Sequence, residues 1–305
     1  MDLGANTNFK LVLLSFLSQK IIEALETMTT ENFTWNLDKA TIEGKIWKTS
    51  NAPKGVVALV HGFFEHIARY QHVAEYFDQH DIALVGYDQR GHGKSSGKRG
   101  HVKKYEWLLE DVERLIQKAQ EVFPNTPVVL YGHSWGGNIV TNYLLKRDTS
   151  KLAGAVVSSP WLKLATDPPK FQVALGKFVG KLFPGFTQTG PLNEADLSTD
   201  LSVGKAYKAD PLIHNKISVA TFLSTIEAGL WALDNAQKLQ LDTLLMHGDD
   251  DNITSHTASQ AFAQKAPEKV TLQIWEGMRH ETHNEVKKEE VLKKVTEWIV
   301  GKVTS

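Results

Sequence analysis

The sequence contains no cysteine. A chain without thiols cannot form disulfides, bind a metal through thiolates or use a cysteine nucleophile. It also lacks an apolar run of the roughly 20 residues that a membrane-spanning helix needs. The nearest run, LVLLSFL at 11–17, is not followed by the small residues of a signal cleavage site. We therefore expect residues 1–29 to be an N-terminal extension of a cytoplasmic protein, with a signal or anchor segment as the alternative.

An excess of charge of either sign is also missing. The chain has 34 Lys and Arg against 35 Asp and Glu, a formal net charge of −1. Because nucleic-acid binding requires a clustered basic excess, we expect no nucleic-acid partner. No dinucleotide fingerprint, HExxH motif or EF-hand spacing occurs in the sequence. We therefore expect no metal and no cofactor.

Short apolar segments alternate with segments long enough for amphipathic helices. Strands buried on both faces of a parallel sheet have nearly continuous apolar sequences, so this alternation predicts an α/β fold. An antiparallel hairpin at one edge is predicted over 32–37 and 41–48, where apolar and polar residues alternate. The predicted buried strands are 56–60, 82–87, 128–131, 153–157, 243–246 and 270–275. The predicted helices are 68–80, 104–122, 135–147, 254–266 and 285–300.

The alternation stops at residue 159 and resumes after residue 236. The sequence of the segment between these two residues predicts helices and loops interrupted by prolines. We expect a core formed by 30–158 and 237–305, split by a helical lid at 159–236. Within this lid, apolar residues recur at helical spacing over 171–183, while Lys170, Lys177 and Lys181 share the opposite face. Such a helix fits two roles equally, contact with a membrane surface or packing on the core with solvated lysines.

A G-x-S-x-G pentapeptide occupies residues 132–136, where a predicted strand runs into a predicted helix. A serine on such a sharp strand-to-helix turn is exposed above the carboxyl end of the sheet. The turn leaves no room for side chains two residues before and after the serine, which accounts for Gly132 and Gly136. The following helix N-terminus presents backbone N–H groups toward an anion. We predict that Ser134 is the nucleophile of an acyl-transfer reaction.

A serine nucleophile needs a base, and on such a turn the chain order is serine, acid, histidine. Downstream of Ser134, His280 and His283 lie in the loop between the last predicted strand and the last predicted helix. We favour His280 because it is nearer the strand, with His283 as the alternative. The acid is expected after the preceding strand, where residues 249–251 are all aspartates. Spacing does not separate these three.

An acyl transfer also requires two backbone N–H groups that stabilise the oxyanion. One is predicted to be the amide of Trp135, directly after the nucleophile. The second is expected from the loop after the strand at 56–60, where the pair His61-Gly62 lets the backbone turn inward. This places the second donor at Phe63.

Six stretches of the sequence resemble the α/β-hydrolase superfamily and, within it, the monoacylglycerol lipase and lysophospholipase group of serine aminopeptidase S33-like hydrolases. The resemblance spans most of 56–300 and implies a mostly parallel central sheet flanked by helices, with a helical lid. The stretches are HGFFEHIARY (61–70), YDQRGHGKSSGKRGHV (87–102), YGHSWGG (131–137), KAYKADPLIH (205–214), MHGDDDNIT (246–254) and EGMRHETHNE (276–285).

The resemblance also implies roles for single residues. The HGxxD pattern of the group assigns the acid to Asp251, and its closing motif assigns the base to His280. A head-group pocket formed by a glutamate, an arginine and a histidine falls on Glu65, Arg69 and His283.

The sequence departs from the group at one point, because the residue after His-Gly is usually small and is here Phe63, followed by Phe64. We expect both phenylalanines to narrow the acyl entrance and Phe64 to contact substrate. The resemblance implies a serine hydrolase acting on single-chain lipid esters, foremost monoacylglycerol. A lysophospholipase or general carboxylesterase is the enzymatic alternative, and a hydrolase-fold ligand receptor is the non-enzymatic one.

Overall fold

The computed structural model describes residues 27–37, 40–167, 169, 176, 182–190 and 192–304. Most of the expected N-terminal extension therefore lies outside the described residues. So do Lys170, Lys177 and Lys181 and most of the helix expected over 171–183. No helix in the described ranges is long and apolar enough to cross a membrane.

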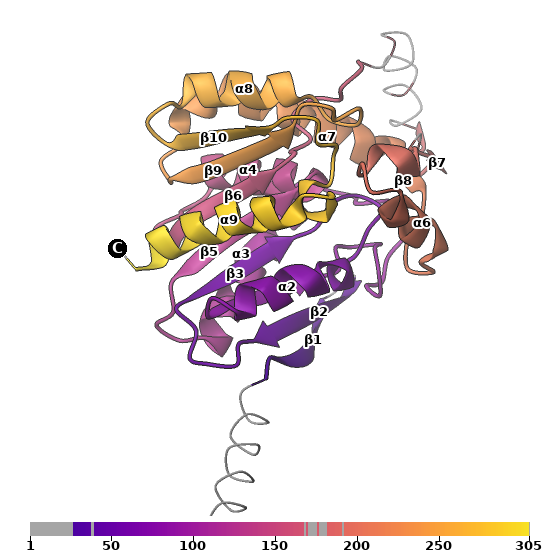
Figure 1. Ribbon diagram of the computed structural model, residues 1–305. Coiled ribbons are helices and arrows are strands. Elements are labelled where there is room, and N and C mark those ends of the chain that lie inside the picture. Colours follow the sequence, from indigo (N-terminus) through magenta and orange to yellow (C-terminus); the bar gives the residue numbers. More distant parts are fainter. Residues whose placement is uncertain are drawn as a thin grey trace, which may run out of the picture.

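An eight-stranded sheet forms the centre of the molecule, in the order β1-β2-β4-β3-β5-β6-β9-β10 (Figure 1). The pairs β1–β2 and β2–β4 are antiparallel, and the remaining neighbours are parallel. The expected edge hairpin and parallel sheet are therefore confirmed. The strands are β1 (Thr29–Leu37), β2 (Ala40–Lys48), β3 (Gly55–Val60), β4 (Ile82–Tyr87), β5 (Val128–His133), β6 (Leu152–Ser158), β9 (Thr243–Gly248) and β10 (Val270–Trp275).

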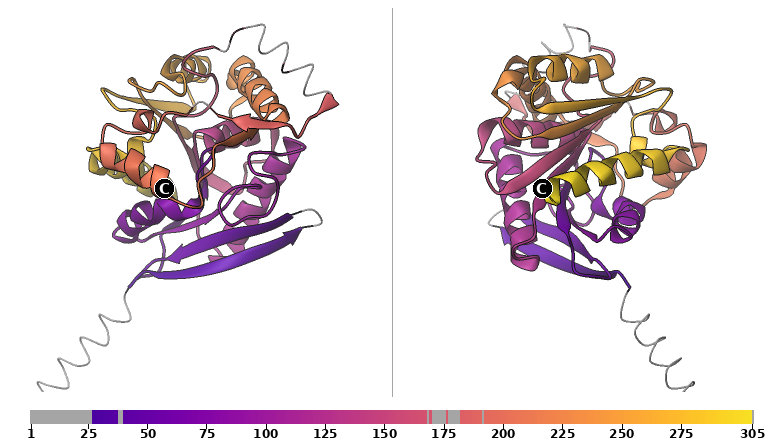
Figure 2. Two further views of the ribbon diagram at one scale, coloured as in Figure 1. Left: turned by 90° about the vertical axis from the view of Figure 1, so that its right-hand side faces the viewer. Right: turned by 60° about the vertical axis from the view of Figure 1, so that its left-hand side comes forward.

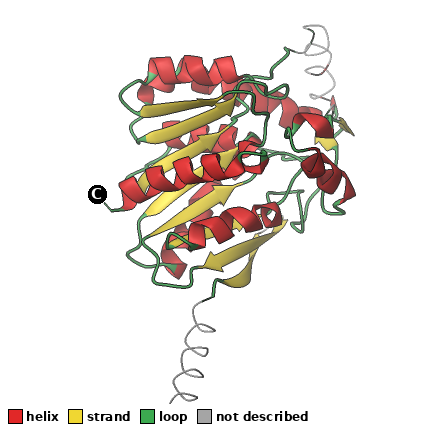
Figure 3. Ribbon diagram, in the orientation of Figure 1, coloured by secondary structure: helices red, strands yellow, loops and turns green. Residues whose placement is uncertain are grey.

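Helices cover both faces of this sheet (Figures 1 and 3). The helices α2 (Gln71–Asp78) and α9 (Lys288–Val303) pack on one face, and α3 (Glu106–Val122), α4 (Trp135–Lys146) and α8 (His256–Lys265) pack on the other. Every residue of β3, β4 and β5 is consequently buried, which explains their uninterrupted apolar sequences. Short 3-10 helices form at η1 (Ile67–Tyr70), η2 (Glu194–Asp196), η3 (Ala236–Lys238) and η4 (Thr282–Asn284).

The chain between β6 and β9 leaves the sheet beyond the carboxyl ends of the parallel strands, and Figure 2 (left) looks onto this side. It forms α6 (Leu201–Ala209), α7 (Val219–Asp234) and a two-stranded sheet of β7 (Thr187–Thr189) and β8 (Lys216–Ser218). From the sequence we expected only helices and loops here. The two strands were not predicted because three residues are too few to show a periodicity.

Helix α7 packs directly on α4. The Trp135 indole donates to the Thr225 hydroxyl at 3.0 Å, and the Asn142 amide donates to the Ala228 carbonyl at 3.1 Å. Both donors are buried, so these bonds fix α7 against the helix that follows the G-x-S-x-G turn. The extent of a lid at 159–236 stays a prediction.

Candidate active site

Ser134 lies at the turn between β5 and α4, with backbone angles φ 54° and ψ −115°. A positive φ is unfavourable for a residue with a side chain and marks a strained turn. A Cβ at Gly132 would lie 2.5 Å from the Gly136 carbonyl oxygen, and one at Gly136 would overlap the Val60 carbonyl. The expected steric reason for both glycines is therefore confirmed.

The structure brings Ser134, His280 and Asp251 together in one chain of hydrogen bonds. The Oγ atom of Ser134 lies 2.8 Å from Nε2 of His280. The other ring nitrogen of His280, Nδ1, lies 2.7 Å from Oδ2 of Asp251. All three side chains are at least nine-tenths buried. This is the arrangement in which an imidazole removes the serine proton while a carboxylate fixes its tautomer.

The other aspartates of the loop after β9 have different contacts. Asp249 accepts the Gly277 N–H at 2.7 Å, and Asp250 lies 3.4 Å from Nε of Arg279. Both are exposed, whereas Asp251 is buried. Only Asp251 of the three therefore contacts His280 among the described interactions.

His283, the alternative base, is 1% exposed, and its ring stacks on Tyr70 at 5.0 Å. Its ring also lies edge-on against His133, at 4.8 Å. Burial lowers its pKa to about 3, so the ring is neutral at pH 7. No hydrogen bond joins the His283 ring to Ser134 in the described part of the chain.

The carboxylate of Asp251 is stabilised by several donors. Its Oδ1 accepts the backbone N–H groups of Ile253 at 2.8 Å and Thr254 at 2.9 Å. Its Oδ2 accepts from His280 and lies 3.0 Å from Nε2 of His247. Burial acts to raise the pKa of Asp251, but the charge of His280 and the hydrogen bonds from both histidines hold it well below the usual range. Asp251 therefore stays ionised.

The electrostatic surroundings of His280 favour its charged form. Burial acts to lower its pKa, but the Asp251 carboxylate, with smaller contributions from Glu281 and Glu65, raises it above the ordinary value. A base with a raised pKa binds the serine proton more readily. The site can thus hold the imidazolium that forms when Ser134 attacks.

The loop after β3 lies directly beside Ser134. A Cβ at Gly62 would lie 2.8 Å from Oε1 of Glu65 and 3.1 Å from the Ser134 Cβ, so a side chain there would crowd both residues. The next N–H belongs to Phe63, and Trp135 is the first residue of α4. In the described chain neither N–H donates to a backbone carbonyl, which leaves both available as the predicted oxyanion donors.

The rings of Phe63 and Phe64 are packed inside the protein. Phe63 lies 4.5 Å from the Trp135 ring and 4.7 Å from the rings of His92 and Phe64. Phe64 has φ 70°, and its ring lies 5.8 Å from that of His214. The expected effect of both phenylalanines on the acyl entrance stays a prediction.

Glu65 and Arg69 belong to a buried ionic network. Arg69 donates to Oε2 of Glu65 at 2.7 Å and binds both carboxylate oxygens of Glu281, at 2.6 and 2.7 Å. Burial opposes ionisation of Glu281, but Arg69 lowers its pKa to about 2. Because Glu281 directly follows His280, this network connects the loop after β3 to the base. The head-group role that the resemblance implied for Glu65, Arg69 and His283 stays a prediction.

No role was predicted from the sequence for His247, Thr254 or Glu281. The Thr254 hydroxyl lies 2.9 Å from Asp251 Oδ2 and 3.3 Å from His280 Nδ1. The only local signals for these residues are their positions beside the predicted acid and base. In the described ranges, no group of three or more potential ligand residues is placed to hold a metal ion.

Comparisons with known proteins agree with this geometry. The family model of serine aminopeptidase, S33, matches residues 51–287. A monoacylglycerol lipase from Mycolicibacterium smegmatis is 35% identical over 261 residues, which cover 84% of this chain and 91% of that protein. An uncharacterised abhydrolase domain-containing protein from Dictyostelium discoideum is 36% identical over 268 residues, 87% of this chain but 28% of that protein.

The same relationship holds among solved structures. The crystal structure of Paleococcus ferrophilus monoacylglycerol lipase is 29% identical with a TM-score of 0.77, and the match covers 90% of this chain and 99% of that one. The family match, the sequence identity and the fold therefore lead to one assignment. The chain belongs to the serine aminopeptidase S33 family of α/β-hydrolases, within its monoacylglycerol lipase group.

Proposed function

We propose that this protein is a serine hydrolase that cleaves monoacylglycerol to a fatty acid and glycerol. The observation that carries the proposal is the hydrogen-bonded chain Ser134–His280–Asp251 at a strained strand-to-helix turn. The similarity to a monoacylglycerol lipase along nearly its whole length supports the substrate class.

The geometry supports an acyl-enzyme mechanism. Ser134 Oγ attacks the ester carbonyl carbon while His280 Nε2 takes its proton, and Asp251 stabilises the imidazolium. The N–H groups of Phe63 and Trp135 hold the oxyanion. His280 then returns the proton to the glycerol oxygen as the ester bond breaks. A water molecule, deprotonated by His280, attacks the acyl-enzyme and releases the fatty acid and Ser134.

A substrate panel tests this function. We expect hydrolysis of monoacylglycerols with kcat/KM well above the values for lysophospholipids and short p-nitrophenyl esters, and rapid labelling of Ser134 by a fluorophosphonate probe. A higher kcat/KM for lysophospholipids would make the protein a lysophospholipase, and a preference for the short esters would make it a general carboxylesterase. An unlabelled protein would be a ligand receptor on a hydrolase fold.

We also propose that the glycerol leaving group lies beside Glu65, Arg69 and His283. What supports this placement is that Arg69 pairs with Glu281, the residue after the proposed base. The network is joined through the backbone of Glu281 to His280, which returns the proton to the alcohol in this mechanism. Buried glycerol hydroxyls need hydrogen-bond partners, so the residues that line the leaving-group end of the site should be polar.

We also propose peripheral contact with anionic membranes through the lid. The side chains of Leu182, Phe183 and Phe186 are 59%, 65% and 55% exposed. Beside them the exposed Lys98 donates to the carbonyl of Gly185 at 2.5 Å. Exposed apolar side chains next to basic ones are typical of a surface that binds lipid. A cytoplasmic location stays a prediction.

Vesicle binding tests this second proposal. Changing Phe183 and Phe186 to Ser should weaken binding to vesicles containing phosphatidylserine, and Lys98→Glu should weaken it most at low salt. Hydrolysis of a soluble short ester should be unaffected in these variants. Vesicle affinity equal to that of the wild type would contradict membrane contact at this surface. The roles of Lys170, Lys177 and Lys181 in the same contact stay a prediction.

A further inference from the structure

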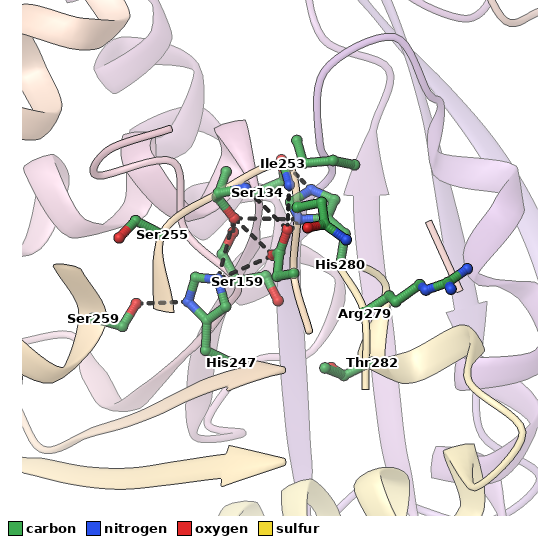
Figure 4. A network of polar contacts seen from close by, with 12 residues as sticks. Ser134, Ser159, His247, Ile253, Ser255, Ser259, Arg279, His280 and Thr282 are labelled. Atoms are coloured by element: carbon green, nitrogen blue, oxygen red, sulfur yellow. Dashed lines mark hydrogen bonds and ion pairs between the residues drawn. The ribbon is translucent and has the colours of Figure 1, made fainter. Parts of the chain in front are cut away.

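Two histidines contact the same carboxylate oxygen in the proposed active site (Figure 4). Oδ2 of Asp251 lies 2.7 Å from Nδ1 of His280 and 3.0 Å from Nε2 of His247. His247 lies on β9, four residues before Asp251, and is fully buried. The mechanism above uses His280 and gives His247 no role.

The hydrogen-bond partners of His247 determine where its proton lies. An ionised carboxylate only accepts hydrogen bonds, so Nε2 of His247 carries the proton that it donates to Asp251. The other nitrogen, Nδ1, is then an acceptor, and the Ser259 hydroxyl lies 2.8 Å from it. Ser259 is a buried residue of α8. The hydroxyl of Ser259 can donate to Nδ1 and so supports the tautomer in which His247 donates to Asp251.

The charge state of His247 differs from that of His280. The titratable groups that face it are Asp251, His280 and His256, whose ring lies 6.4 Å away. Burial lowers the pKa of His247 below its ordinary value although Asp251 acts to raise it. His247 therefore stays neutral at pH 7, and it donates a hydrogen bond without competing with His280 for the proton of Ser134.

The contacts of Asp251 show what this donor adds. Oδ1 is held by the backbone N–H groups of Ile253 and Thr254. The donors near Oδ2 are side chains, and the Thr254 hydroxyl also lies 3.1 Å from the Ser159 carbonyl, to which it can donate instead. His247 is the partner that holds Oδ2 from the side of the sheet. Without it, Oδ2 would keep only His280 and the shared Thr254 hydroxyl as partners, and rotation of the carboxylate away from His280 would meet less resistance.

We propose that His247 is a positioning residue for the hydrolysis, holding Oδ2 of Asp251 where it orients the imidazole of His280. This inference rests on the proposed function of Ser134, His280 and Asp251. His247 does not touch the substrate in this proposal. Its effect passes through Asp251 to the base, so its loss should change proton transfer rather than substrate binding.

The test compares His247→Leu, His247→Gln and Ser259→Ala, with His256→Ala as the matched control. Leucine removes the donor, whereas a glutamine amide places a donor near the position of Nε2. Ser259→Ala leaves the ring but removes the hydroxyl that contacts its Nδ1. For each variant the rate of Ser134 labelling by a fluorophosphonate, kcat and KM for a p-nitrophenyl ester, the pH profile of kcat/KM and the melting temperature are measured.

We expect His247→Leu to slow labelling and lower kcat at least about tenfold, with KM within about twofold, because a small misplacement of the base is costly. The acid limb of the profile should move to lower pH, since a carboxylate that is turned away from His280 stabilises the imidazolium less. His247→Gln should restore most of the rate, Ser259→Ala should give an intermediate loss, and His256→Ala should match the wild type.

Wild-type labelling in His247→Leu would overturn the proposal. So would equal losses in the Leu and Gln variants with an unmoved acid limb, since that pattern shows a role in stability alone. The labelling rate does not depend on the ester class. A wild-type protein that labels rapidly but does not hydrolyse monoacylglycerol would therefore overturn the proposed substrate while still allowing His247 to be judged.

Discussion

Gly62 donates its backbone N–H to Oε1 of Glu65 at 2.5 Å. Glu65 is 2% exposed, and its carboxylate also accepts from the Tyr70 hydroxyl at 2.9 Å and from Arg69 at 2.7 Å. A buried, fully hydrogen-bonded carboxylate thus holds the residue that precedes the proposed oxyanion donor Phe63. The shape of this loop depends on Glu65 whether or not Glu65 also contacts glycerol.

Glu65→Ala should therefore lower kcat/KM for monoacylglycerol and for a p-nitrophenyl ester alike, each at least about tenfold or about 1.4 kcal/mol of transition-state stabilisation. The reason is that both reactions use the same oxyanion site. The measurement is a comparison of both substrates, with the exposed Glu75→Ala as a control that should match the wild type. A loss of kcat/KM that is confined to monoacylglycerol would instead show that Glu65 acts mainly by contacting the glycerol group.

Ser134→Ala should abolish ester hydrolysis and fluorophosphonate labelling, because no other hydroxyl in the described chain contacts His280 Nε2. The Oγ atom makes one hydrogen bond and little packing, so the melting temperature should stay within a few degrees of the wild type. Intact-protein mass spectrometry after probe treatment checks the labelling. A labelled Ser134→Ala protein would show that another residue is the nucleophile.

Asp251→Asn should lower kcat by about 10⁴, the size of the effect known for the aspartate of the serine protease triad. An amide donates where the carboxylate accepted, which favours the wrong tautomer of His280. Asp250→Asn is the matched control, since Asp250 is exposed and its carboxylate pairs with Arg279 rather than with His280. Steady-state kinetics on one ester compare the two variants. A larger loss of kcat in Asp250→Asn than in Asp251→Asn would identify Asp250 as the acid that orients His280.

The pH dependence follows from His280. Its pKa is raised above the ordinary 6.5, and only the neutral ring can accept the Ser134 proton. Activity should therefore be low at acidic pH and rise through an apparent pKa above 6.5 in the profile of kcat/KM, which reports the free enzyme. Asp251 stays ionised across this pH range, so it adds no second inflection to the profile of kcat/KM. A profile that is already flat above pH 5.5 would contradict this assignment of the base.

Much of the fold and part of the site were predictable from the sequence because their causes are local. The apolar segments at 56–60 and 128–131 were predicted to be strands buried on both faces, and they form β3 and β5. The glycines around Ser134 indicated the tight turn, since side chains there would overlap the backbone. The order of motifs then identified the group and pointed to Asp251 and His280.

Contacts between distant parts of the chain could not be predicted in this way. Spacing left three adjacent aspartates equivalent, and the resemblance selected Asp251. The packing of two loops brings Asp251 to 2.7 Å from Nδ1 of His280. The bidentate pairing of Arg69 with Glu281, 212 residues away, and the donation of His247 to Asp251 depend on the same packing.

The difference between the features that were predictable from the sequence and those that were not has a physical reason. Periodicity and turn sterics act within a few residues, so the sequence by itself determined the alternation of strands and helices and the position of the nucleophile. Hydrogen bonds between buried side chains depend on which atoms the completed sheet and its loops bring within about 3 Å of each other. The tertiary structure alone therefore decided how the acid and the base are held and that Glu65 is bound to its own loop.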